Sequence, residues 1–412
     1  MAPASAKAAP KTGPIQLHQA DYASVRETVE LHQRFLKGLP GGRLANFSHM
    51  DLSNFALEGV DLRRAELTGA RLTGAFLAAA RLDRANLYGA DLRDVDLRRA
   101  SLTQVDLRGA CLRGANLSGA DLSDCDMREG LIAVQDAVHG FRILRHDERS
   151  GELDYAVMRG ANLAGAHNND GTMVATDFTD AVLAGARLTR SRMMRTMLDG
   201  ADLTGADVFQ TDLAGASLKQ AVLTGVDMDG ASFQDADMTG VLRAPPPLVY
   251  VDDEPLHEVV NAHEQWCDSQ GLKGAPARLK GADLRGLKSL ARRRLTALNA
   301  EGAILFGMSL EGAQLQGCDL SGADLRSVNL KGADLRGAKL VGANLTRADL
   351  TGADLRPLSI SSGRFIRADL CRAKLRHTLL SNARLDHCRL LEADLDGARL
   401  DGTVMTGSEQ EV

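Results

Sequence analysis

The hydrophobic residues of this chain recur at every fifth position over most of its length. The repeated unit reads A-x-L-x-x, as in the run ANLYG ADLRD VDLRR ASLTQ that begins at Ala85. The central apolar residue follows this spacing from Leu52 to Met127, again from Phe178 to Met238, and a third time from Leu305 to Leu400. A short internal repeat of this kind predicts a solenoid, in which one small unit is stacked many times.

Neither an α-helix nor a straight strand can bury this pattern. On a helix, each step of five residues rotates the side chain by about 140°, which scatters the leucines around the axis. On a continuous strand, an odd step moves successive leucines to opposite faces. A chain that turns a corner after every fifth residue resolves the conflict, because Ala and Leu then both point inward. Four such sides close a square coil, and coils stack at roughly 4.8 Å.

Two known repeat architectures place leucines at short, regular intervals. A leucine-rich repeat needs a unit of about 20–29 residues with an Asn or Cys ladder, and the sequence contains no such longer unit. The runs ANLSG ADLSD, ADLTG ADVFQ and ADLRG AKLVG ANLTR instead resemble the pentapeptide-repeat family. This resemblance implies a right-handed quadrilateral β-helix. It implies little about function, because members of the family are diverse.

Shifts in the phase of the repeat divide the chain into blocks. We predict, in order, a disordered leader (1–20), a helical cap (21–46), repeat block 1 (47–127), an inserted β-hairpin (128–160), repeat block 2 (161–240), a Pro-rich linker (241–253), a second helical cap (254–278), repeat block 3 (279–407) and a tail (408–412). Both caps contain H-x-x-[FW], at His32 and His263, and would cover the open ends of the coils. The predicted fold is therefore mainly β: two right-handed quadrilateral β-helical rods with short α-helical caps.

The insertion at 128–160 interrupts the first predicted rod. Residues 140–146 and 152–158 flank the turn-like sequence DERSG and predict the two strands of its hairpin. Block 2 then begins irregularly, and the polar residues 167–170 are expected to disrupt a coil. We interpret the hairpin as a flap on the rod surface. A recognition arm is the alternative, because loops often carry function.

Composition narrows the class of protein further. The 412 residues are 44% hydrophobic, which is too high for a disordered chain, and only 4% aromatic. The net charge of −5 gives no strong bias toward nucleic acid or anionic membranes. The six cysteines show no CxxC spacing, and the sequence has no membrane-spanning or signal-like apolar run, so we expect a cytoplasmic protein. Cys125, Cys318 and Cys388 occupy Ala positions and should be buried.

The sequence contains no motif that supports catalysis. It lacks GxGxxG in a strand-to-helix context, GxxxxGK[ST], HExxH and GxSxG. The many Asp residues lie between Ala and Leu, where a solvated ladder explains them better than acid–base pairs. His263 and Cys267 are spaced to share a metal, but structural metal sites need more ligands, so a buried cap face is favoured. We expect no enzyme activity, cofactor or metal site.

Charged residues supply two candidate contact surfaces. A basic cluster opens block 3 and is either a solvated first coil or a contact for an anion or partner: Lys280, Arg285, Lys288, Arg292, Arg293 and Arg294. In blocks 1 and 3 Asp and Arg alternate, so their charges mostly cancel. Block 2 is more acidic, and its candidate acidic face consists of Asp199, Asp202, Asp207, Asp212, Asp227, Asp229, Asp235 and Asp237.

These observations favour a non-enzymatic scaffold that presents a rigid surface to a protein partner. The alternative comes from the resemblance, since some pentapeptide-repeat proteins mimic DNA and inhibit type II topoisomerases. That mechanism needs a strongly negative rod, so it is restricted here to block 2. Direct nucleic-acid binding and membrane binding are not expected. The last coil has no helix after it, so end-to-end pairing of two copies is a further expectation.

Overall fold

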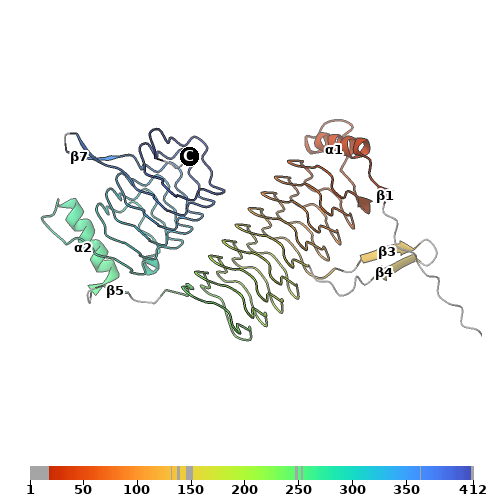
Figure 1. Ribbon diagram of the computed structural model, residues 1–412, viewed down its shortest axis with the longest axis horizontal. Coiled ribbons are helices and arrows are strands. Elements are labelled where there is room, and N and C mark those ends of the chain that lie inside the picture. The colour runs from red at the N-terminus through yellow and green to blue at the C-terminus, as the bar shows by residue number, and fades with distance from the viewer. Residues whose placement is uncertain are drawn as a thin grey trace, which may run out of the picture. The chain divides into compact units, whose positions relative to one another are not determined.

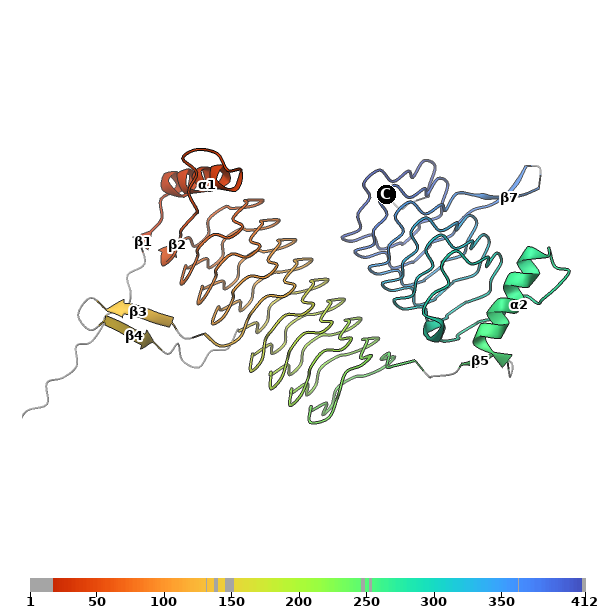
Figure 2. The same ribbon diagram turned by 180° about the vertical axis from the view of Figure 1, so that it is seen from behind.

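The five-residue repeats form the sides of stacked coils (Figures 1 and 2). The computed structural model describes residues 18–130, 132–136, 140–144, 152–245, 249–251, 254–361 and 363–409. Parallel bridges join residues twenty apart, from Asn46 with Glu66 onward. Five residues per side and twenty per turn give each coil four sides, as the repeat predicts.

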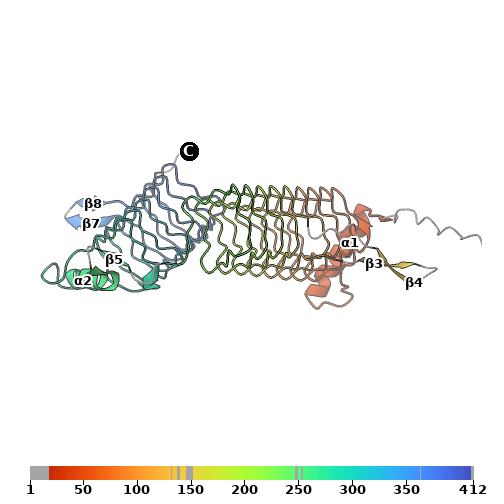
Figure 3. The same cartoon turned by 90° about the horizontal axis from the view of Figure 1, so that it is seen from below.

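Each side of a coil is held by hydrogen bonds to the coils before and after it. The N–H of Leu67 donates to the carbonyl of Asn86 at 2.7 Å, and the N–H of Asn86 donates back to the carbonyl of Ala65 at 2.9 Å. This pattern repeats along both units, so buried backbone groups are satisfied without long strands. The coils of the first unit stack in register when seen from below (Figure 3).

Alanine and leucine side chains fill the inside of the coils. Ala85 and Leu87 are both buried, and the same is true of most repeats in two separate core clusters. The fifth residue of each repeat turns the corner with a positive φ, such as 62° at Gly69. Some corners place a side chain in this region, as at Asp94 (φ 55°), which costs about 1 kcal/mol or more per residue.

The chain divides into two compact units, Met1–Arg243 and Ala244–Val412. The boundary falls inside the Pro-rich stretch, and each unit contains its own hydrophobic cluster. Cys125, Cys318 and Cys388 are buried in these clusters at Ala positions. Burial raises the pKa of the Cys388 thiol to about 12, so this group is an inert core residue.

In the first unit, helix α1 (Tyr22–Leu36) covers the first coil. Asp21 caps the helix by accepting a hydrogen bond from the N–H of Ser24 at 2.8 Å. The His32 ring is fully buried, and its Nδ1 accepts a hydrogen bond from the N–H of Ala45 at 3.1 Å. Ala45 begins the first coil, so this bond joins the cap directly to the repeats.

In the second unit, helix α2 (Leu256–Asp268) covers the first coil, and a buried histidine again joins the cap to the repeats. The fully buried His263 accepts from the N–H of Ala277 at 3.0 Å, and its ring stacks on Trp266 with 5.6 Å between centroids. The H-x-x-[FW] motif therefore has a defined role in both units. Its histidine accepts the N–H that opens the first coil, and its aromatic residue packs on the imidazole.

The inserted hairpin differs from the sequence-based prediction. Strands β3 (Ile132–Asp136) and β4 (Gly140–Leu144) pair antiparallel, with Ile132 opposite Leu144. Residues 152–158 are not a hairpin strand, and the prediction was wrong there. Glu152 pairs with Cys111, and Leu153 is buried, so the coil resumes at 152 and not at 161. The five-residue spacing of Leu153 and Met158 explains this, because both enter the core.

The prediction that residues 167–170 disrupt a coil was also wrong. His167 pairs with Asp126 on one side and Arg187 on the other, so the coil continues unbroken. Asn168 occupies the Leu position of this repeat and is fully buried. Its Oδ1 and Nδ2 atoms have no hydrogen-bond partner among the described residues. A Cβ at Gly171 would meet the Asn168 side chain, so the small residue makes room for the amide.

The Asn168→Leu substitution is expected to stabilise the first unit by about 1–2 kcal/mol. Leucine has nearly the same shape as asparagine and removes two buried polar atoms that lack partners. The midpoint of urea unfolding measures the effect. Asn162→Leu, at an outward position of the preceding side, serves as the control and should give no gain. An unchanged or lower midpoint for Asn168→Leu would contradict the prediction.

A second hairpin, in block 3, is not foreseen by the sequence analysis. Strands β7 (Leu358–Ser361) and β8 (Arg364–Ile366) pair antiparallel after Pro357 and project from the second unit (Figure 1). The remaining short elements are β1 (His18–Gln19), which pairs with β2 (Met50–Asp51), β5 (Tyr250–Val251), which pairs with β6 (Glu254–Pro255), and the 3-10 turn η1 (Arg285–Leu287). The predicted leader (except residues 18–20), parts of the linker, and residues 410–412 of the tail lie outside the described residues.

Candidate functional site

Asp and Arg side chains outside the coils pair within single repeats. The Asp91 carboxylate accepts two hydrogen bonds from the Arg93 guanidinium, the shorter at 2.6 Å. In the next repeat, the hydrogen bond from Arg98 holds the pKa of the Asp96 carboxyl below its ordinary value of 3.8. Among the described residues the same pair occurs in nine repeats: Asp61–Arg63, Asp91–Arg93, Asp96–Arg98, Asp106–Arg108, Asp126–Arg128, Asp283–Arg285, Asp324–Arg326, Asp334–Arg336 and Asp354–Arg356. A carboxylate with a lowered pKa, such as Asp96, is poorly suited to general acid–base chemistry at neutral pH.

The structure places two residues of the predicted basic cluster, Arg293 and Arg294, against helix α2. Ion pairs involve four of its six residues: Lys280 with Glu301 (2.9 Å), Arg285 with Asp283 (2.6 Å), Arg293 with Glu264 (2.8 Å) and Arg294 with Asp268 (2.6 Å). Glu264 and Asp268 belong to α2, so Arg293 and Arg294 tie the cap to the first coils. Lys288 and Arg292 are exposed. Much of the cluster's charge is therefore balanced within the unit.

The eight aspartates of the predicted acidic face do not share one face. Asp202, Asp207, Asp212 and Asp237 belong to four different columns of bridges, and these columns are the four sides of the coil. The interpretation as a single face was wrong, because residues five apart lie on neighbouring sides and only residues twenty apart share a side. The eight carboxylates instead surround the last coils of the first unit. Lys219 is the one Lys or Arg between positions 199 and 242.

His263 and Cys267 lie side by side on α2. The Cys267 Sγ is 3.6 Å from the His263 Nε2, while the Nδ1 of that ring already accepts the Ala277 N–H. Burial raises the pKa of the Cys267 thiol. His257 is exposed, and its Nε2 lies 3.8 Å from the Glu258 carboxylate. Within the described part of the chain, no three His, Cys, Asp or Glu side chains are grouped so as to hold a metal ion.

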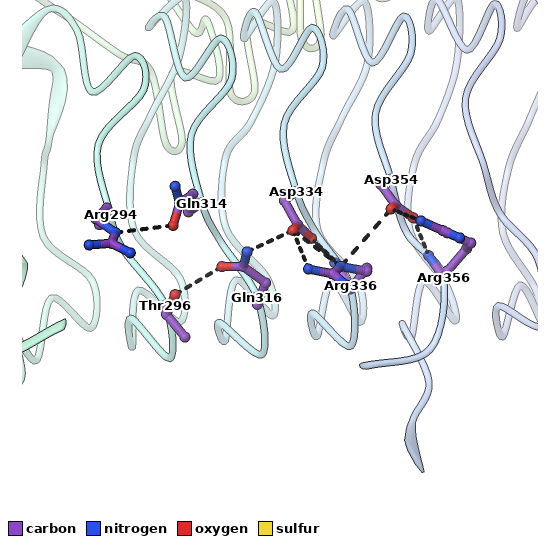
Figure 4. A network of polar contacts seen from close by, with 8 residues as sticks. All are labelled: Arg294, Thr296, Gln314, Gln316, Asp334, Arg336, Asp354 and Arg356. Atoms are coloured by element: carbon purple, nitrogen blue, oxygen red, sulfur yellow. Dashed lines mark hydrogen bonds and ion pairs between the residues drawn. The ribbon is translucent and has the colours of Figure 1, made fainter. Parts of the chain in front are cut away.

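A chain of polar contacts follows one side of the second unit and ends at the β7–β8 hairpin (Figure 4). Gln316 links two coils, because its Nε2 donates to Asp334 at 2.6 Å and its Oε1 accepts from Thr296 at 2.9 Å. Asp334 binds Arg336 at 2.7 Å, and the Arg336 Nε lies 4.0 Å from Asp354. Asp354 binds Arg356 at 2.6 Å, directly before Pro357, where the hairpin leaves the coil.

The base of this hairpin borders a groove of about 640 Å³. Eight residues line it: Arg336, Arg356, Pro357, Phe365, Arg367, His387, Gly407 and Glu409. On the hairpin itself, Ile360 and Phe365 are 52% and 63% exposed. A hairpin with exposed apolar side chains beside a groove rich in arginine is the most distinctive surface of the second unit. The sequence analysis assigned none of these residues to a site.

The repeats also match a known protein family. The family model described as pentapeptide repeats matches eight segments, which together span more than half of the chain: 43–77, 80–119, 93–128, 176–213, 209–242, 294–332, 329–356 and 364–407. The chain is a pentapeptide-repeat protein. Proteins of this family form right-handed quadrilateral β-helices and are generally non-enzymatic structural repeat proteins. The family suggested by the sequence is thus confirmed.

Three solved pentapeptide-repeat proteins illustrate the similarity. HetL, from the cyanobacterium Nostoc and involved in heterocyst differentiation regulation, is 22% identical over 86% of this chain and 88% of its own, with a TM-score of 0.18. Rfr23, from the cyanobacterium Cyanothece, is 20% identical over 32% and 89%, with a TM-score of 0.27. QnrB1, a plasmid-mediated fluoroquinolone resistance protein, is 14% identical over 83% and 91%, with a TM-score of 0.12. No curated protein matches the chain.

In this pentapeptide-repeat protein, the hairpin rests on glycine corners of the coils beneath it. A Cβ at Gly337 would lie 2.7 Å from the Cβ of Leu358 and 3.2 Å from the carbonyl oxygen of Ile366. A side chain at Gly317 would touch Leu358 as well. Pro357, which interrupts the A-x-L-x-x pattern, is the signal in the sequence that could have located the hairpin. No helix in the described ranges is long and apolar enough to cross a membrane.

The Gly337→Ala substitution is expected to displace the β7–β8 hairpin and to destabilise the unit by about 1–3 kcal/mol beyond the backbone strain, because the new methyl group overpacks the contact. Gly332→Ala is the matched control. Both glycines have a positive φ, 67° and 59°, but a Cβ at Gly332 meets nothing within 4 Å. Hydrogen exchange of the β7–β8 amides measures the effect. Equal exchange in both variants would contradict it.

Proposed function

We propose that this pentapeptide-repeat protein is a non-enzymatic scaffold that recognises a protein partner through its second unit. The observation that carries the proposal is the β7–β8 hairpin, whose apolar side chains Ile360 and Phe365 point to solvent at more than half of their area. Exposed aromatic and aliphatic groups with a polar rim are typical of protein interfaces. The stacked coils beneath give this surface a rigid base.

A photo-cross-linking amino acid at position 360 tests the proposal in cells that produce the protein. We expect covalent adducts with one or a few proteins. The matched control is the same probe at Phe76, which is 47% exposed on a plain coil of the first unit. Adducts at 360 but not at 76 would support the proposal. An absence of adducts at 360, or the same adducts at both positions, would contradict it.

A second candidate, inhibition of a type II topoisomerase, is favoured by the charge of the last coils of the first unit. Positions 199–242 contain eight Asp and one Lys, and the Asp residues occur on all four sides. Negative charge on every side is a property of a DNA duplex. The test is a gyrase supercoiling assay. Inhibition that is lost when Asp202, Asp207 and Asp212 are changed to Asn would support this candidate, and no effect at micromolar protein would remove it.

End-to-end pairing of two copies is a further proposal. The last described coil of the second unit leaves Leu400 41% exposed, at the repeat position whose leucine is buried in the preceding coils. An uncovered coil end is a surface on which another chain can pair. Sedimentation velocity should show a dimer that dissociates when Leu400 is replaced by Asp. A monomer at all concentrations would exclude this proposal.

A further inference from the structure

The groove beside the β7–β8 hairpin carries more positive than negative side chains. Arg336, Arg356 and Arg367 line it together with His387, whereas Glu409 is the one carboxylate among the lining residues. A guanidinium has five N–H donors, and a bidentate contact with a carboxylate uses two of them. The contacts with Asp334 and Asp354 therefore leave further donor capacity on Arg336 and Arg356.

The same groove has an apolar wall. Phe365, which is largely exposed, and Pro357 both line it. The Phe365 ring stands on β8 opposite Ser359 of β7, so no bulky cross-strand neighbour covers it. An exposed aromatic ring beside planar guanidinium groups suits a ligand that combines an apolar side chain with carboxylates.

We infer that this groove binds a short acidic peptide segment of a partner protein, with an aromatic or aliphatic side chain against Phe365 and carboxylates on Arg356 and Arg367. The inference rests on the proposed role of this surface in protein recognition and names the class of partner. The apolar contact supplies burial, and bidentate Arg–carboxylate contacts supply orientation.

Glu409 occupies part of the site that such a segment would use. Its carboxylate accepts a hydrogen bond from the Arg367 Nη1 and lies 3.6 Å from the Arg389 Nε. A carboxylate of the partner would replace Glu409 on Arg367. Removing the charge of Glu409 should therefore strengthen binding, whereas reversing the charge of Arg356 should weaken it.

The test is selection of a random peptide library, displayed on phage, on the full chain. We expect the enriched peptides to combine Asp or Glu with an aromatic or aliphatic residue. A synthetic peptide of the selected sequence should lose affinity about tenfold or more on Arg356→Glu and on Phe365→Ser, and gain affinity on Glu409→Gln. Isothermal titration measures the affinities. If Arg356→Glu folds poorly, the expected gain in peptide affinity of Glu409→Gln still tests the inference, because a misfolded variant would not gain affinity.

Arg93→Glu is the matched control, because Arg93 forms the same 2.6 Å pair with Asp91 in the first unit and should leave peptide binding unchanged. The inference would be overturned by a failure to enrich any peptide, by enriched peptides without acidic residues, or by equal affinity of the wild type and Arg356→Glu. These outcomes differ from failure of the proposed function. If a protein is cross-linked at position 360 but no acidic peptide binds, the proposed scaffold function stands and the inference of an acidic partner segment is rejected.

Discussion

The Leu335→Ala substitution is expected to lower the free energy of unfolding of the second unit by about 2–5 kcal/mol. Leu335 is fully buried in the cluster of that unit, and truncation removes its contacts and leaves a cavity in a narrow core. The loss should fall on one unit, because the hydrophobic cluster of the first unit contains none of the same residues. Differential scanning calorimetry of the full chain measures both effects.

Leu400→Ala is the matched control for Leu335→Ala. Leu400 occupies the equivalent position of its repeat, but it lies in the last coil with much of its side chain exposed. Its truncation should cost less than about 1 kcal/mol, in proportion to the smaller buried area. Similar losses for the two variants would show that coil position does not govern core stability. If Leu335→Ala lowered the unfolding temperatures of both units equally, the two units would not have separate cores.

The His263→Ala substitution is expected to destabilise the second unit by about 2–4 kcal/mol. The change leaves the Ala277 N–H without its acceptor and removes the buried ring that packs on Trp266. His257→Ala, on the same helix, is the control, because His257 is exposed and should contribute less than about 0.5 kcal/mol. Urea unfolding followed by Trp fluorescence measures both, since Trp266 is the one tryptophan of the chain.

The same histidine predicts how the second unit responds to acid. Burial lowers the pKa of His263 below its ordinary value of 6.5, because the charged ring would lose its hydration. The unfolded chain then binds this proton more readily than the folded protein. Stability is therefore complete above about pH 6.5 and falls as the pH is lowered below it. His263→Ala should show a shallower loss between pH 6.5 and 5, and an unchanged slope would contradict the prediction.

Much of the fold could be predicted because its information is local. The five-residue spacing of Leu and Ala is compatible with burial only if the chain turns at each fifth residue, so the four-sided coils followed from the sequence. The H-x-x-[FW] segments likewise indicated helices at the start of each set of repeats. The hydrogen bonds from Ala45 and Ala277 to His32 and His263 could not be predicted. They depend on where the cap crosses the first coil.

The errors at residues 152–158 and 167–170 both came from judging a short segment by its own residues. The alternating residues 152–158 fit both a hairpin strand and a repeat, and local pattern alone does not separate the two. These residues form a repeat because Leu153 and Met158 then enter an existing core. This arrangement buries more apolar area than an isolated hairpin can. At residues 167–170 the polar sequence argued against a coil. Backbone hydrogen bonds maintain the coil there: His167 bonds with Cys125 and Met127 of the preceding coil, and residues 166 and 168 bond with Arg187 of the following coil.

The surroundings of the candidate site residues could not be predicted from the sequence. Sequence spacing identified the basic cluster and the eight aspartates as residue types, but their surroundings were decided in three dimensions. Glu264 and Asp268, from a helix about thirty residues earlier, neutralise Arg293 and Arg294. The groove likewise combines Arg336, Phe365 and Glu409, which are separated by dozens of residues.

By itself, the sequence determined the coil, its core positions and its caps, because each depends on residues within one or two repeats. Only the tertiary structure decided which charges of the basic cluster are neutralised by helix α2, where the second hairpin lies, and which side chains form the groove. The physical reason is the geometry of the coil. Successive repeats lie on different sides, whereas repeats that share a side are a full turn or an insertion apart along the chain.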